Sequence, residues 1–171
     1  METPEVPRHF MEEILEATIS SSYARNIFYD EGPNGIHATR AQIHSFIIEQ
    51  FGSGKSTLLK SIPNSYMLTE FTHPGILGTI SDKGELVKGA ILNAAGKVLV
   101  IDELQNLTLN AKYAILDLLE DQTHSRALGY TSKKGFNRGS LDKNCWRIEA
   151  KTNQFRIYAR FSCVASGVFL P

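Results

Sequence analysis

The sequence predicts an α/β protein in which a parallel sheet is flanked by helices. Apolar runs alternate along the chain with segments whose apolar residues recur at helical spacing, as is typical of this class. One run, Val98 to Ile101, is wholly apolar and predicts a strand buried on both faces, as parallel strands are. A glycine-rich turn at 52–54 separates another apolar run from a helical pattern. Ligands of such sheets bind at the edge where these turns lie.

The predicted elements follow one another in a regular order. Residues 10–19 form an apolar stripe at helical spacing and, with a connecting segment, make up an N-terminal region over 1–40. Residues 41–171 form the core. Its strands are expected over 43–48, 66–71, 98–101 and 161–168, and its helices over 57–61, 82–94 and 110–121. We expect His73-Pro74-Gly75 to break the chain, and Ser81 or Asp82 to cap the second of these helices.

The last third of the chain predicts a long β-hairpin over 125–161, before the final core strand. Residues 125–130 and 146–161 have strand-like patterns, and the Gly/Ser/Asn/Lys-rich piece 131–144 between them is expected to form the tip. Trp146, Phe155 and Phe161 lie in strand-like alternation, so we expect them in the core.

The glycine-rich turn predicts a phosphate-binding loop. The residues expected to surround the nucleotide are Phe51, Gly52, Ser53, Gly54, Lys55, Ser56 and Thr57. Backbone N–H groups of such a loop curl around phosphates, Lys55 would reach the β- and γ-phosphates, and the Ser56 hydroxyl would ligate Mg²⁺. Glu49 stands where the first glycine of the pattern belongs. The alternative is an ordinary glycine turn before a helix.

An acidic pair follows the apolar strand and predicts the second half of the same site. Asp102 would hold the Mg²⁺ shell, and Glu103 would orient and deprotonate the attacking water. The alternative is a buried strand with two solvated acids at its exit. The two motifs in this order predict a nucleoside triphosphatase that uses ATP and Mg²⁺.

The order of parts over residues 41–168 resembles the ATPase core of AAA+ proteins, most of all the minichromosome-maintenance helicase branch. The resemblance implies that Lys55 and Ser56 contact phosphate and Mg²⁺, and that Asp102 and Glu103 are the metal-shell acid and the base. A polar residue ending the last core strand senses the γ-phosphate in that family. Ser166 is the candidate here, because 164–168 contain no asparagine. RecA-type recombinases share the run Phe51 to Lys55.

The distribution of charge suggests what the ATPase acts on. Lys+Arg and Asp+Glu both number 18, yet residues 126–160 carry nine basic and two acidic residues, a net +7. We expect the hairpin to bind DNA phosphates through Lys133, Lys134, Arg138 and Lys143. Tyr130, Phe136 or Trp146 could stack on bases, although the strand-like alternation favours the core for Trp146. A solvated basic loop is the alternative. The predicted function is ATP hydrolysis coupled to action on DNA. The alternatives are ATP-dependent protein remodelling and a nucleotide-binding fold whose catalysis has lapsed.

The remaining expectations concern location and assembly. Cys145 and Cys163 have no metal-site or disulfide spacing, which favours a reducing, cytoplasmic location. No stretch approaches the roughly 20 apolar residues of a membrane span, and no signal pattern opens the chain, so no membrane partner is expected. The chain ends after the fourth core strand, so the core is expected to lack the family's helical lid. A homo-oligomeric ring is expected if a lid is supplied.

Overall fold

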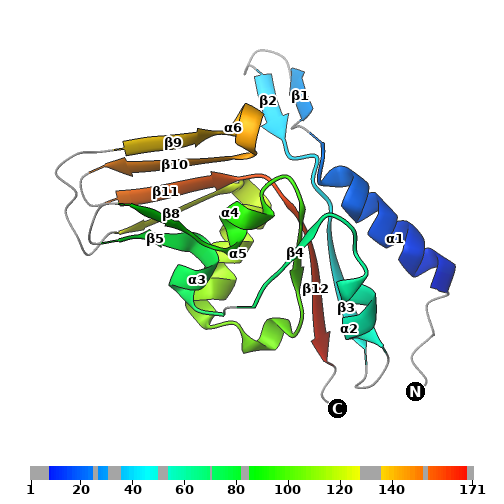
Figure 1. Cartoon of the computed structure of the whole chain (residues 1–171). Helices are drawn as coiled ribbons and strands as arrows, with labels where there is room; N and C mark the ends of the chain where they lie inside the picture. The colour runs from blue at the N-terminus through cyan, green and yellow to red at the C-terminus, as the bar shows by residue number, and fades with distance from the viewer. Residues whose placement is uncertain are drawn as a thin grey trace.

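The computed structural model describes residues 8–24, 27–30, 36–49, 54–69, 71–81, 85–127, 136–151 and 154–168 (Figure 1). A parallel sheet has the strand order β3 (His44–Glu49), β12 (Ser162–Val168), β7 (Val98–Ile101) and β4 (Ser65–Met67). An antiparallel sheet has the order β8 (Thr123–Ala127), β11 (Gln154–Ala159), β10 (Trp146–Lys151) and β9 (Phe136–Ser140). The expected α/β class with a parallel sheet flanked by helices is confirmed.

Helices cover the two faces of the parallel sheet because the side chains of its central strand alternate. The helices are α1 (Arg8–Ser21), α2 (Lys55–Lys60), α3 (His73–Leu77), α4 (Ala90–Ala94) and α5 (Leu109–Asp121). Val98 and Val100 pack with Leu15 of α1 and Leu59 of α2. Leu99 and Ile101 point to the other face and pack with residues of α3, α4 and α5. The strand over 98–101 and the helix over 110–121 are therefore as predicted.

The region between β4 and β7 differs from the prediction. The strand expected over 66–71 ends at Met67, and His73-Pro74-Gly75 begins α3 instead of breaking the chain, with the Thr72 hydroxyl accepting from the Gly75 N–H at 3.2 Å. The helix expected over 82–94 is a hairpin strand followed by a short helix. The hairpin pairs β5 (Gly78–Ile80) with β6 (Leu86–Lys88), and Gly89 precedes α4. Ser81 caps no helix, because its hydroxyl accepts from the Glu85 N–H ahead of β6, and Asp82 lies outside the described residues.

The predicted β-hairpin over 125–161 is instead a four-stranded antiparallel sheet. Residues 136–144, expected in the tip, form β9 and the short helix α6 (Leu141–Asn144). β11 pairs with β10 on one side and with β8 on the other. Local patterning indicated strands over 125–130 and 146–161, but not that 136–140 form a strand or that 146–161 contain two strands, with β11 inserted between β8 and β10. Phe155 and Phe161 are buried and Trp146 packs against the core, as predicted.

The N-terminal region packs on the parallel sheet through hydroxyl side chains. Thr18 Oγ1 lies 2.5 Å from Ser45 Oγ, and Ser21 Oγ lies 2.8 Å from Ser162 Oγ. Phe10 and Ile14, from the predicted apolar stripe, are exposed. The predicted helix is confirmed, and Leu15 and Ile19 of the stripe pack in the core, but the buried face also includes the hydroxyl residues Thr18, Ser21 and Ser22 in place of Phe10 and Ile14. Between α1 and β3, β1 (Ile27–Asp30) pairs with β2 (Ile36–Thr39), a hairpin where a plain connection was expected.

None of the helices among the described residues is long and apolar enough to span a bilayer.

Candidate functional site

The register of the parallel sheet brings the two predicted motifs to one edge. Ala165 of β12 pairs with Ile101 of β7, so Ser166 of β12 lies beside Asp102, the first residue after β7. On the other side of β12, Gly167 pairs with Ile48 near the end of β3. Helix α2 begins at Lys55, a few residues after β3 ends. The end of β12 therefore lies between the lysine motif and the acidic motif.

The start of α2 carries the predicted phosphate-contacting residues. Gly54 has a left-handed backbone with φ of +86°, which only glycine adopts without strain, and its carbonyl accepts the first helical N–H groups, from Thr57 and Leu58. Lys55 Nζ donates to the Gly167 carbonyl at 2.7 Å. Ser56 Oγ donates to Asp102 Oδ2 at 2.7 Å. The structure thus brings Lys55, Ser56 and Asp102 together as predicted.

Asp102 is held at both carboxylate oxygens. Ser56 donates to Oδ2, and the fully buried Ser166 donates to Oδ1 at 2.8 Å. Burial favours the neutral acid, but these two hydrogen bonds and the positive charge of Lys55 outweigh it and lower the pKa of Asp102 below its ordinary value. The group is therefore a carboxylate at neutral pH and a suitable oxygen ligand for a hard cation.

Glu103 has a different environment from its neighbour. Its backbone is left-handed, with φ of 62° and ψ of 64°, and its N–H donates to Ser166 Oγ at 3.3 Å. Its carboxylate oxygen Oε2 accepts from Asn106 Nδ2 at 2.7 Å. Glu103 is exposed to solvent. Ser166 was predicted to sense the γ-phosphate, and its hydroxyl contacts Asp102 and the Glu103 amide.

The donor set suits Mg²⁺ bound together with a nucleotide. No group of three His, Cys, Asp or Glu side chains that could hold a metal occurs among the residues the structure describes. Mg²⁺ in phosphate sites needs only one or two protein ligands, because phosphate oxygens and water supply the others. The Asp102 carboxylate and the Ser56 hydroxyl meet that requirement, because they lie 2.7 Å apart and the hydroxyl oxygen keeps lone pairs for a cation.

Several predicted site residues fall elsewhere or outside the described part of the chain. Phe51, Gly52 and Ser53 of the loop, and Tyr130, Lys133 and Lys134 of the expected tip, lie outside it. Thr57 is exposed in the first turn of α2. Arg138 lies in the middle of β9, and Lys143 lies on α6, the short helix that follows this strand. The sequence reasoning missed Asn106 and Gly167. A polar residue three positions after Glu103 was the available signal for Asn106.

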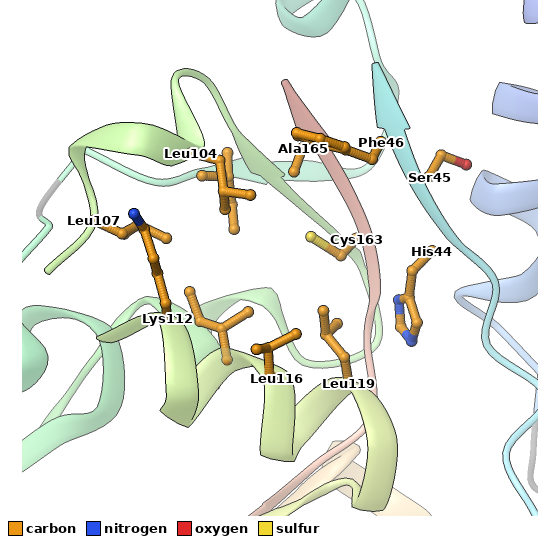
Figure 2. A pocket seen from close by; sticks show the side chains of 12 residues that line it. His44, Ser45, Phe46, Leu104, Leu107, Lys112, Leu116, Leu119, Cys163 and Ala165 are labelled. Carbon is orange, nitrogen blue, oxygen red and sulfur yellow. The ribbon is translucent and has the colours of Figure 1, made fainter. Parts of the chain in front are cut away.

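A separate cavity lies between α5 and the sheet (Figure 2). Its volume is about 250 Å³, and its lining is mostly apolar, including Phe46, Leu116 and Cys163. His44 lies at its β3 side. Burial, with a smaller contribution from the charge of Arg40, lowers the pKa of His44 from 6.5 to about 4, although the Leu119 backbone partly opposes this. The imidazole is therefore neutral, and Lys112 is the charged residue in a lining that is otherwise apolar or neutral, which does not suit a triphosphate.

No family model matches the chain, and no curated protein sequence matches it. The case for a function therefore depends on the chemistry of the site itself.

Proposed function

We propose that this chain is a Mg²⁺-dependent ATPase with a P-loop nucleoside triphosphatase core. The observation that carries the proposal is the 2.7 Å hydrogen bond between Ser56 Oγ and Asp102 Oδ2. These residues are 46 positions apart, and each belongs to a motif that separately predicted one half of a Mg²⁺–triphosphate site. A chance glycine turn and a chance acidic pair have no reason to meet at the carboxyl edge of one sheet.

The residues divide the work of phosphoryl transfer between them. Lys55 moves from the Gly167 carbonyl to the β- and γ-phosphates, because an ammonium prefers an anion to a neutral oxygen. Ser56 and Asp102 would hold Mg²⁺, which neutralises phosphate charge when bound. Glu103 orients the attacking water and accepts its proton. Positioned charge, rather than a covalent intermediate, carries this reaction.

Steady-state hydrolysis of ATP tests the proposal. Lys55→Ala and Glu103→Gln should each lower the rate by about a hundred-fold or more, since charge stabilisation and base catalysis each contribute factors of that size. Lys60→Ala is a matched control, because Lys60 is an exposed lysine in the last turn of the same helix. If the wild type, Lys55→Ala and Glu103→Gln share one background rate, catalysis has lapsed and the proposal is wrong.

The target of the proposed activity is DNA, with protein remodelling as the alternative. The net positive charge of residues 126–160 supports DNA as the target. Two of the residues expected to contact it, Arg138 and Lys143, are exposed. The order of motifs supports a AAA+ core of the minichromosome-maintenance type, which would act as a homo-oligomeric ring. Single-stranded DNA binding measured across a salt series separates the two targets: a DNA motor loses affinity steeply as salt rises, and a protein remodeller binds little DNA at any salt.

A further inference from the structure

We propose that Asn106 is a positioning residue that holds the carboxylate of the base Glu103. The inference rests on the proposed ATPase function and extends it to a residue outside both motifs. Asn106 Nδ2 donates to Glu103 Oε2 at 2.7 Å, a short distance for an amide-to-carboxylate hydrogen bond. Among the described residues, Asn106 is the hydrogen-bond partner of this carboxylate. The hydroxyls of Ser56 and Ser166 donate to the carboxylate of Asp102 instead.

The backbone between the two residues is arranged to allow this contact. Glu103 is in the left-handed region, which is unusual for a residue with a long side chain. The short 3₁₀ helix η2 (Leu104–Asn106) follows, and the Asn106 N–H donates to the Glu103 carbonyl at 2.9 Å. The turn is fixed to the sheet at both ends, by the bond from the Glu103 N–H to Ser166 Oγ and by the buried Leu107.

A general base needs such a partner because its side chain is otherwise free to rotate. Glu103 is exposed, so an unsupported carboxylate would sample several rotamers and would spend little time aimed at one water molecule. Asn106 occupies Oε2 and leaves Oε1 for the water. Its amide is neutral, so it orients the base without pairing its negative charge with a cation. Asn106 does not itself touch substrate in this scheme.

The test compares Asn106→Ala with Gln105→Ala, a neighbour on the same exposed turn whose side chain makes no hydrogen bond to Glu103. Asn106→Ala should lower kcat for ATP by about ten-fold and leave KM within about two-fold, because orientation of the base matters only in the transition state. Asn106→Asp should lower kcat further than Asn106→Ala does, since a second carboxylate would repel that of Glu103. Gln105→Ala should match the wild type.

A double-mutant cycle separates positioning from a general structural effect. In the Glu103→Gln background, Asn106→Ala should cause no further loss, because it acts only through that carboxylate. Wild-type kcat in Asn106→Ala, a higher kcat, or a full additional loss in the double variant would each overturn the inference while leaving the proposed function standing. A wild type that binds ATP but does not hydrolyse it would overturn the proposed function, and the role of Asn106 with it.

Discussion

At the scale of single residues, Ser166 links the two acids of the site. Its hydroxyl donates to Asp102 Oδ1 and accepts from the Glu103 N–H, and it is fully buried at the end of β12. One side chain therefore fixes both the carboxylate expected to hold Mg²⁺ and the backbone of the expected base. Because the Ser166 hydroxyl makes both hydrogen bonds, it holds Asp102 and Glu103 in fixed positions before any nucleotide binds.

Ser166→Ala should lower ATP hydrolysis by roughly ten-fold, because Asp102 loses a donor and the Glu103 amide loses its acceptor. It should also destabilise the fold by about 1–2 kcal/mol, as expected for a buried hydrogen bond left unmade. Ser162→Ala is the control. Ser162 is equally buried on the same strand, but its hydroxyl bonds to Ser21 of α1. Kinetics and urea unfolding should show similar stability losses and different activities; equal activities would refute the role of Ser166.

His44 makes stability depend on pH. Its pKa of about 4 in the fold lies below the ordinary value of 6.5, so the unfolded chain binds a proton more readily than the folded one. The contribution of neutral His44 is therefore fully present above about pH 6.5 and is lost as the pH falls toward 4. The urea midpoint of His44→Phe should vary less than that of the wild type between those pH values. Parallel midpoint-against-pH curves would contradict this assignment.

At the scale of elements, the β5–β6 hairpin and α4 depend on close backbone contact between two glycines. A Cβ on Gly78 would lie 2.5 Å from the Val87 carbonyl oxygen and 2.7 Å from the Gly89 nitrogen, and Gly78 has a φ of +85°. Gly89 is extended and sits directly against Gly78, so the chain leaves β6 there and starts α4. This contact explains why the apolar residues between 86 and 94 do not form one helix.

Gly78→Ala should destabilise the protein by about 3 kcal/mol or more, because it combines a backbone clash with a strained φ. Chemical denaturation monitored by circular dichroism measures the loss. Thr79→Ala, at the next position of the same strand, should cost less than about 1 kcal/mol. If both variants are equally stable, the glycine contact is not what ends β6.

At the scale of the whole molecule, the antiparallel sheet is joined directly to the site. β11 leads through Arg160 and Phe161 into β12, which carries Ser166 and Gly167 and ends at Val168. Figure 1 shows β11 continuing into β12. The Arg160 N–H donates to the Cys145 carbonyl at 2.9 Å, which ties this joint to the base of β10. The antiparallel sheet is therefore continuous in the chain with the strand that contacts Lys55 and Asp102. This connection gives the proposed coupling between DNA and ATP a physical route.

Arg138→Gln and Lys143→Gln should each weaken single-stranded DNA binding and reduce the slope of log affinity against log salt by about 0.7, the value for one lost contact to a single strand. ATP hydrolysis without DNA should be unchanged, because both residues lie on the antiparallel sheet and its short helix. Lys60→Gln on α2 is the matched control for loss of one surface charge. Equal slopes in all three variants would show that neither residue contacts the nucleic acid.

The sequence by itself determined the elements whose patterns are local. Four apolar residues in β7 and the helical spacing in α5 each depend on near neighbours, and both elements formed as predicted. Gly54, the described residue of the glycine-rich turn, directly precedes α2. The positions of Lys55, Ser56, Asp102 and Glu103 were also predictable, because each motif places its residue types at a strand or helix end. The sequence also predicted that these residues lie together at one edge of the sheet, and the parallel register of β12 with β3 and β7 places them there.

Only the tertiary structure decided the features that depend on distant partners. Gly89, which precedes α4, lies so close to Gly78, eleven residues earlier, that neither position has room for a Cβ. β11 pairs between β8 and β10, although sequence proximity suggested a simple hairpin. The contacts of Gly167 with Lys55 and of Ser166 with Asp102 join residues 112 and 64 positions apart. Periodicity reports which face of an element is apolar, but long-range pairing and steric contact determine what each face meets.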